Sequence, residues 1–349
     1  MGRETHITNF KGLSKTIPGE CDVFKVNSKF GAVPIGPSCN QLAVLCLSKG
    51  QRLSGGVIPH LVCGNTIGDF AFDPFDEHKI AIGCDNGVVQ FWTVPEEGLT
   101  ENLDQFDRKL VAHNERLTII QFHPNASHVL ATFAMDFDLI IWNIETMEPK
   151  IKIKVHSKPV FGMSWSPDGT LLATLCKDQK IRVFEPRADE NPIAEGLATQ
   201  GSRGGRVCWA QKGNVLIVTG FSRVSERQFL VFDKNDLSKP IASEGLDVSP
   251  AILVPFYDED SSTLFLSGKG DSTIYTFEIS SPADSPPYIH HLSHYNTPTP
   301  HQSVAYLYKR FCDVRSVEFA KGYRLTATSI EPISFTVPRL RVISDQNYK

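Results

Sequence analysis

The sequence has little of what a disulfide-stapled, membrane-spanning or nucleic-acid-binding protein needs. Its eight cysteines stand singly, mostly among apolar residues, without one C-x-x-C pair. No hydrophobic run approaches the ~18 residues of a membrane span, and the polar first residues are unlike a signal peptide. Lys and Arg number 35 against 39 Asp and Glu, and the net charge of −4 argues against nucleic acid as a partner. These absences predict a cytoplasmic protein.

Motifs of common catalytic sites are also missing. The sequence contains neither G-x-S-x-G nor H-E-x-x-H. The segment 267–273 has Gly270 after Lys269, where a phosphate-binding loop requires Ser or Thr. Three histidines at 290–294 have nearly metal-ligand spacing, but their segment is broken by prolines, so a solvated loop is the preferred interpretation and a zinc site the alternative. We therefore expect no cofactor and no metal, and predict that the protein is not an enzyme.

What the sequence does contain is an internal repeat. In each copy an aromatic residue ends a short apolar strand, and an acidic or turn residue lies six positions before it. The closing aromatics are Trp92, Trp142, Phe184, Phe232 and Phe277. Their spacings of 50, 42, 48 and 45 residues are typical of WD40 blades, which have roughly 40–45 residues and four strands each.

This repeat predicts an all-β fold, a seven-bladed WD40-type β-propeller with a ring closed by strands from both termini. Five blades are visible directly, and the segments between markers have the pattern of β-hairpins. We expect a sixth blade over about 280–320 and a seventh that joins the N-terminal segment to about 322–340, since closure leaves no free sheet edge. Six or eight blades are the alternatives. The predicted domains are an N-terminal extension (1–19), the propeller (20–341) and a C-terminal tail (342–349).

Two repeat units carry polar residues at matched positions. One unit has His113, Thr132, Asp136 and Trp142, and the next has His156, Thr174 and Asp178, with Phe184 in place of Trp. The pattern is similar to the WD40 tetrad, whose side chains hydrogen-bond across the strands of one blade. Thr, His and Asp are also the residue types of a hydrolase triad. We interpret both sets as structural, because an active site has no reason to recur in successive units and buried polar groups need partners.

Several segments resemble the fixed motifs of coronin propellers and follow in that family's order. They are CKDQKIRVFEPR (176–187), VTGFSRVSERQ (218–228), GKGDSTIYTFE (268–278) and EPISFTVPR (331–339). VNSKF at 26–30 resembles the strand that precedes the family's first blade. The similarity spans nearly all of 20–341. Segments 61–99 and 245–271 are most similar to the second propeller of the long coronins, which carry two propellers in tandem.

The resemblance implies a non-enzymatic module that binds actin filaments and links them to cell polarity, motility and membrane trafficking. Other cytoskeletal or trafficking proteins are further implied partners, and the cytoplasm, cytoskeleton and Golgi or vesicles the implied locations. No heptad pattern follows Arg341, so the coiled coil of short coronins is not expected. We expect a monomeric fragment without the first propeller and the acidic tail of long coronins.

One departure from the family pattern keeps a second function open. Short coronins follow Ser-Lys-Phe with Arg-His, whereas here Gly31 follows Phe30. If that basic corner contacts filaments, this propeller binds them weakly. The alternative is therefore a scaffold or adaptor in Golgi, vesicle or ubiquitin pathways with weak or no direct actin contact.

Basic residues at strand ends and loops form the candidate partner surface, because binding residues concentrate on loops of a rigid scaffold. They are Lys29, Lys177, Lys180, Arg223, Arg227 and Lys269. The alternative is that these are solvated charges, or that Arg227 pairs with an acidic neighbour inside the fold.

Overall fold

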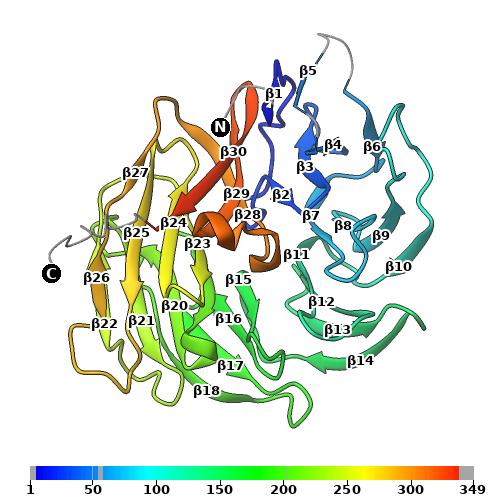
Figure 1. Ribbon diagram of the computed structural model, residues 1–349. Coiled ribbons are helices and arrows are strands. Elements are labelled where there is room, and N and C mark those ends of the chain that lie inside the picture. The colour runs from blue at the N-terminus through cyan, green and yellow to red at the C-terminus, as the bar shows by residue number, and fades with distance from the viewer. Residues whose placement is uncertain (1–4, 49, 54–57, 202, 338–349) are drawn as a thin grey trace, which may run out of the picture.

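The computed structural model describes residues 5–48, 50–53, 58–201 and 203–337. Their strands form seven sheets arranged around a central axis, as in a propeller (Figure 1). This confirms the predicted all-β fold with seven blades, and excludes the alternatives of six or eight.

The first three blades follow one another from residue 25. The first blade contains β2 (Lys25–Val26), β3 (Phe30–Ile35), β4 (Gln41–Cys46) and β6 (His60–Val62). The second contains β7 (Ile67–Phe72), β8 (Lys79–Cys84), β9 (Val88–Thr93) and β10 (Arg108–Val111). The third contains β11 (Leu117–Phe122), β12 (Val129–Ala134), β13 (Leu139–Asn143) and β14 (Glu148–Ile153).

The next three blades repeat this order, from the innermost strand to the outermost. The fourth contains β15 (Val160–Trp165), β16 (Leu172–Cys176), β17 (Lys180–Phe184) and β18 (Pro192–Leu197). The fifth contains β19 (Arg206–Ala210), β20 (Val215–Phe221), β21 (Arg227–Asp233) and β22 (Ala242–Gly245), with a short helical turn η2 (Gln211–Gly213). The sixth contains β23 (Leu253–Asp258), β24 (Thr263–Gly268), β25 (Thr273–Ile279) and β26 (Ile289–His291), and β27 (Tyr295–Asn296) also pairs with β25.

The seventh blade closes the ring with strands from both ends of the chain. It contains β28 (His301–Tyr306), β29 (Glu318–Thr326), β30 (Ser329–Thr336), β1 (Ile7–Thr8) and β5 (Gln51–Arg52), with the helical turns η3 (Lys309–Phe311) and η4 (Val314–Ser316) between β28 and β29. Ile7 of β1 lies opposite Ile330 of β30 in antiparallel register. The prediction that strands from both termini close the ring is therefore confirmed, because β1 covers the edge that β30 would otherwise expose.

The predicted positions of the last two blades were wrong. Residues 280–320 do not form one blade, since they are divided between the sixth and seventh. The N-terminal segment from residue 25 builds a complete first blade, and only β1 joins β30. The repeat could not reveal that first blade because its third strand, β4, contains no aromatic residue.

The predicted boundary at residue 20 also needs correction. Ile7 and Phe10, assigned to an N-terminal extension, are buried in the cluster between the seventh and first blades. The propeller therefore includes part of 1–19. The predicted tail at 342–349 lies outside the described residues.

Apolar side chains fill each of the interfaces between neighbouring blades. Seven clusters of buried residues can be separated, and each draws its members from two adjacent blades. The second strands of the blades are the most deeply buried. For example, every residue of β3 and of β20 is buried. The five closing aromatics all lie on third strands and are at most 6% exposed, so the marker found in the sequence is an inter-blade packing residue.

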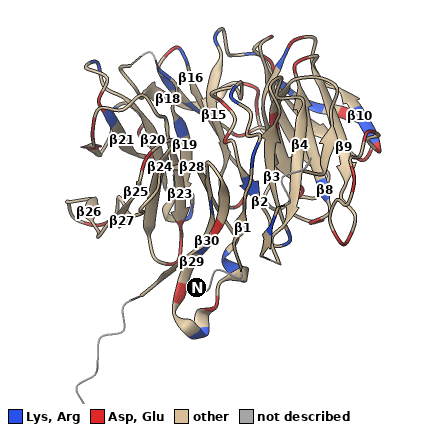
Figure 2. Ribbon diagram, turned by 90° about the horizontal axis from the view of Figure 1, so that it is seen from above, with Lys and Arg blue, Asp and Glu red and all other residues tan. Residues whose placement is uncertain are grey.

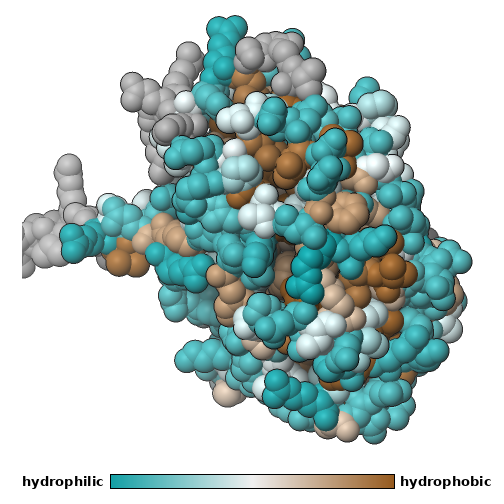
Figure 3. All heavy atoms as spheres, turned by 90° about the vertical axis from the view of Figure 1, so that its right-hand side faces the viewer, coloured by the Kyte–Doolittle hydropathy of each residue, from teal (hydrophilic) through white to brown (hydrophobic). Residues whose placement is uncertain are grey.

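The surface carries charges of both signs. Lys and Arg positions are interleaved with Asp and Glu positions along the ribbon, without a large block of one sign (Figure 2). The side of the ring shown in Figure 3 is mainly hydrophilic, with hydrophobic side chains recessed between hydrophilic ones. No helix within the described ranges is long and apolar enough to cross a membrane.

Candidate partner-binding faces

The ring has two faces with different loops. Successive strands of a blade are antiparallel, so their connections alternate between the two ends. We name the upper face the end that carries the second-to-third-strand turns and the connections between blades. The lower face is the opposite end, with the first-to-second and third-to-fourth connections.

Three of the predicted basic residues lie on the upper face. Lys177, Arg223 and Lys269 lie in the second-to-third-strand turns of the fourth, fifth and sixth blades, which are neighbours in the ring. All three are exposed. Within the described part of the chain, their side chains have neither an ion pair nor a hydrogen bond. We refer to these three residues as the upper basic cluster.

Lys180, the first residue of β17 after the turn that holds Lys177, forms an ion pair. Its Nζ lies 2.8 Å from Glu195 Oε1 on the neighbouring strand β18. Both side chains are more than a third exposed, so the pair is a solvated surface contact worth little stability.

Lys29 lies on the other face. It sits in the turn between β2 and β3, at the lower end of the first blade, and its Nζ is 2.6 Å from Glu96 Oε1. The contact raises the pKa of Lys29 and lowers that of Glu96. The six basic residues therefore do not form one surface, because the turn that holds Lys29 joins first and second strands.

Arg227 is not a surface residue either, and its placement on a partner surface was wrong. Only 1% of its side chain is exposed. Its Nε and Nη2 donate to the two carboxylate oxygens of Asp247 at 2.5 and 2.6 Å, and Nη1 donates to Asp271 Oδ2 at 2.7 Å. The alternative weighed for this residue, pairing inside the fold, is what the structure shows. The bidentate contact lowers the pKa of Asp247, because its negative charge is stabilised by the guanidinium.

A tetrad of hydrogen bonds crosses the third blade. His113 Nε2 and Thr132 Oγ1 are 2.8 Å apart, and Trp142 Nε1 donates to the same hydroxyl at 2.9 Å. His113 Nδ1 lies 3.0 Å from both carboxylate oxygens of Asp136. Burial lowers the pKa of His113, and the Asp136 charge opposes this shift. Each buried polar group has a partner, as a structural network requires.

The matching set in the fourth blade is incomplete. His156 Nε2 bonds Thr174 Oγ1 at 3.0 Å, but Asp178 pairs with Arg182 Nη2 at 2.6 Å instead of His156. The prediction that Asp178 completes the set was therefore wrong. Arg182 occupies the strand position that Ile140 has in the third blade, and a cationic bidentate donor binds a carboxylate more strongly than a neutral imidazole. Burial, and secondly the Arg182 charge, lower the pKa of His156 to about 4.

Each of the three histidines in 290–294 contacts a different residue. His290 Nε2 contacts Ser280 Oγ at 3.0 Å, His291 Nε2 lies 3.2 Å from Glu244 Oε1, and His294 Nδ1 accepts the Thr276 N–H. In the part of the chain that the structure describes, no group of three or more His, Cys, Asp or Glu is arranged to hold a metal ion.

Comparison with known proteins decides the family. The family model "WD domain, G-beta repeat" matches residues 147–185. Coronin-7 of Bos taurus is 41% identical over 342 residues, which cover 98% of this chain and 37% of coronin-7. Coronin-2A of Homo sapiens is 36% identical over 297 residues, which cover 82% of this chain and 56% of coronin-2A. The chain belongs to the coronin family.

A solved coronin structure agrees with the fold. The WD40 domain from Toxoplasma gondii coronin matches with a TM-score of 0.84 at 23% identity, over 97% of this chain and 86% of that domain. The chain spans 37% of the length of coronin-7 and 56% of coronin-2A. Its correspondence to the second propeller of long coronins stays a prediction.

In this coronin propeller, Arg227 forms an ion pair that links two of the segments similar to coronin motifs. Arg227 comes from the motif 218–228, and Asp271 from the motif 268–278 of the next blade. Gly268 makes room for this pair, since a Cβ at its position would lie 2.6 Å from both Arg227 Nη1 and Asp271 Oδ2. These motif residues therefore join the fifth and sixth blades.

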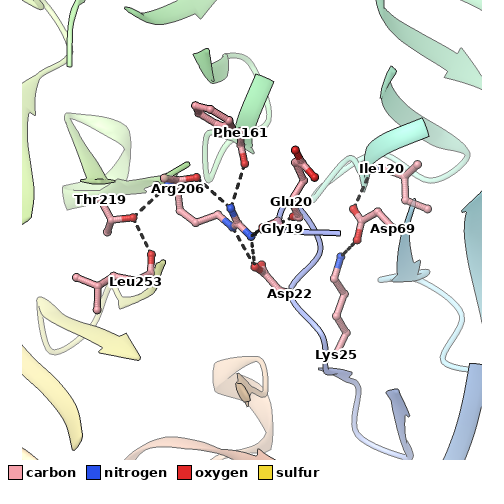
Figure 4. A network of polar contacts seen from close by, with 11 residues as sticks. Gly19, Glu20, Asp22, Lys25, Asp69, Ile120, Phe161, Arg206, Thr219 and Leu253 are labelled. Atoms are coloured by element: carbon pink, nitrogen blue, oxygen red, sulfur yellow. Dashed lines mark hydrogen bonds and ion pairs between the residues drawn. The ribbon is translucent and has the colours of Figure 1, made fainter. Parts of the chain in front are cut away.

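A second polar network of the coronin propeller was missed from the sequence (Figure 4). Arg206, at the upper end of the fifth blade's inner strand, donates to Asp22 Oδ1 at 2.9 Å and to the carbonyls of Gly19 and Glu20. The segment 19–22 precedes the first blade, so it reaches across the central opening to the fifth. The partners are 184 residues apart in sequence, and no local pattern signals such a contact.

The strand that follows this segment, β2, is anchored to the next two blades. Lys25 of β2 donates to Asp69 Oδ1 of the second blade at 2.7 Å, and Asp69 Oδ2 accepts the backbone N–H of Ile120 in the third (Figure 4). The N-terminal segment thereby ties four blades together near the axis.

Proposed function

We propose that this coronin-family propeller is a non-enzymatic binding module that contacts actin filaments through the upper basic cluster. The observation that carries the proposal is an excess of free cations in the upper loops of the fourth, fifth and sixth blades, where Glu226 is, among the described residues, the one carboxylate without an ion pair. Asp178, Asp247 and Asp271 lie there, but each is paired with an arginine. Lys177, Arg223 and Lys269 are exposed and, among the described residues, have no such partner.

This excess of free cations matters because the chain as a whole has a net charge of −4. An acidic filament is therefore not attracted by the overall field. Screening limits electrostatic attraction to ~8 Å at physiological ionic strength, so only a local group of free cations contributes. The expected contact is weak and sensitive to salt. Roles in cell polarity, motility and membrane trafficking are proposed on the strength of the family resemblance.

The test is co-sedimentation of the chain with actin filaments, before and after charge reversal. The triple variant Lys177→Glu/Arg223→Glu/Lys269→Glu changes the local charge by −6, as each of three sites goes from +1 to −1. We expect this variant to remain in the supernatant while the parent pellets at low salt. All three side chains are exposed, so the folded core is not disturbed.

A matched control distinguishes a local contact from the general change in charge. Arg187→Glu/Lys239→Glu/Arg315→Glu makes the same change of −6 at exposed residues of the lower face. The control should pellet with filaments like the parent. If both triple variants bind as the parent does, the upper basic cluster is not the filament site.

An adaptor with weak or no actin contact is the second candidate, favoured by Gly31. A Cβ at Gly31 would lie 2.9 Å from Phe24 Cε2 and 3.2 Å from Leu47 Cδ2. Both contacting side chains are buried. At the position where short coronins have a basic residue, buried neighbours therefore leave no room for a side chain in this propeller. If the parent fails to pellet with filaments even at low salt, the adaptor becomes the better proposal.

A further inference from the structure

A cavity of about 260 Å³ lies beside the axis, at the upper end of the ring. One wall is the segment 17–23, which includes the residues that cross the central opening, and the fifth, sixth and seventh blades supply the other walls. We name this cavity the upper pocket. It is smaller than typical ligand pockets, which have about 300–1,000 Å³, so its size suits one or two side chains of a peptide.

Accessible apolar side chains form two walls of the upper pocket. Ile17 and Pro18 belong to the N-terminal segment, and Ala251, Ile252 and Val254 belong to the sixth blade and the connection that leads into it. All five residues are partly exposed, so they retain apolar surface in contact with water. An aliphatic side chain placed between these walls would remove that surface from water, which is favourable.

Uncharged polar side chains of the upper pocket are free to bind a ligand. Ser267 lies near the end of β24, and Gln302 and Ser303 lie on β28. Within the described ranges, none of these three side chains forms a hydrogen bond. Gln302 and Ser303 are partly exposed. Ser267 is only 5% exposed, but its hydroxyl is not one of the polar atoms that are cut off from solvent. Hydroxyl and amide groups donate hydrogen bonds, so each of the three is a donor for an anionic group.

The charge of the upper pocket also favours an anion. Two cations and one carboxylate line it, Arg206, Lys269 and Asp22. Arg206 and Asp22 neutralise each other at 2.9 Å, and the other N–H groups of Arg206 donate to main-chain carbonyls (Figure 4). Lys269 is exposed and has no ion pair in the part of the chain that the structure describes. Its neighbour Asp271 is already paired with Arg227 at 2.7 Å. Lys269 therefore leaves the pocket with an uncompensated positive charge.

We propose that the upper pocket binds a short segment of a partner protein in which an aliphatic side chain stands beside a glutamate or aspartate. The aliphatic group covers the apolar walls, and the carboxylate accepts from Lys269 and the free hydroxyl and amide donors. No aromatic residue occurs among the described residues that line the pocket, so a base or an aromatic cofactor finds no stacking face there. The site shares Lys269 with the upper basic cluster but does not depend on actin binding.

The test is a ligand-observed NMR titration of the whole chain with the blocked peptide Ac-Ala-Leu-Glu-Ala-NH2. One control peptide, Ac-Ala-Leu-Gln-Ala-NH2, keeps the size of the acidic side chain but lacks its charge. The other, Ac-Ala-Ala-Glu-Ala-NH2, keeps the charge but lacks the aliphatic side chain. We expect the first peptide to bind at least tenfold more tightly than either control.

Variants of the chain locate the binding and separate it from the filament contact. Lys269→Met removes the charge but keeps the stem, and should abolish the preference for glutamate over glutamine. Lys239→Met, the same change at an exposed residue of the lower face, should leave this preference unchanged. Ser267→Ala should weaken the Leu-Glu peptide several-fold without changing co-sedimentation with actin filaments. Thermal melting checks that each variant is folded.

The proposal is overturned if the three peptides bind equally, if none binds at millimolar concentration, or if Lys269→Met and Ser267→Ala bind the peptides as the parent does. If the chain pellets with filaments but shows any of these results, this inference fails and the filament contact stands. If the peptide preference is found but the chain does not pellet with filaments, the opposite holds.

Discussion

Replacement of Arg227 by Met should be among the most destabilising single changes in this propeller. Three short contacts of 2.5, 2.6 and 2.7 Å join its guanidinium to Asp247 and Asp271. Methionine keeps the apolar stem but leaves two neighbouring carboxylates without their cation, and the Asp271 side chain is only 13% exposed. Removing one partner of a buried ion pair costs about 3–5 kcal/mol. We expect the free energy of unfolding to fall by about this amount, measured by urea denaturation with tryptophan fluorescence.

Two control variants show whether the loss of stability comes from the ion pairs of Arg227. Arg223→Met removes an exposed arginine four residues away and should change stability by no more than about 0.5 kcal/mol. Arg227→Met/Asp247→Asn/Asp271→Asn removes the repelling charges as well and should recover at least half of the loss. If Arg227→Met and Arg223→Met have equal effects, the reasoning that makes Arg227 an internal tie between two blades is refuted.

Three further changes test the fold. Asp136→Ala should leave His113 partly unpaired and cost about 1–3 kcal/mol, whereas Asp73→Ala in a surface turn should do little in the same thermal melts; equal losses would undo the assignment of the tetrad. Deleting residues 1–10 removes β1 and exposes the edge of β30, so we expect aggregation or a much lower melting temperature; a soluble, cooperatively melting product would contradict closure by β1. His156 has an ordinary pKa of 6.5 and about 4 in the fold, so only the unfolded chain gains a proton between these values, and stability should fall by about 3 kcal/mol as pH drops from 6.5 to 4. The stability of the parent and of His156→Leu can be measured from urea midpoints at several pH values in this window. If stability falls as steeply with pH in His156→Leu as in the parent, His156 is not the cause of the fall.

The parts of the fold that could be predicted from the sequence are those with a local, repeated signal. The aromatics from Trp92 to Phe277 were found because each ends the third strand of a blade and packs between sheets. The first blade has no such residue on β4. In the seventh, the turn between β29 and β30 is the two-residue Ala327-Thr328, without an acidic marker. Their boundaries depend on pairing between distant strands, which periodicity does not encode.

The candidate site shows the same division. Strand-end turns could be located from the repeat, which is why Lys177, Arg223 and Lys269 fall on one face. Whether a basic residue at such a position is free or paired depends on carboxylates in the next blade. Arg227 is 20 residues from Asp247 and 44 from Asp271, and sequence spacing gave no reason to prefer it over Arg223 as an internal residue.

The most direct test of the proposed filament contact is the salt dependence of co-sedimentation by the unmodified chain. A contact made by the upper basic cluster should pellet the chain with actin filaments at low salt. The bound fraction should fall steeply as ionic strength rises through the physiological range, where the screening length shrinks to ~8 Å. A bound fraction that does not change with salt, or no binding at the lowest salt, would contradict an electrostatic contact on this face.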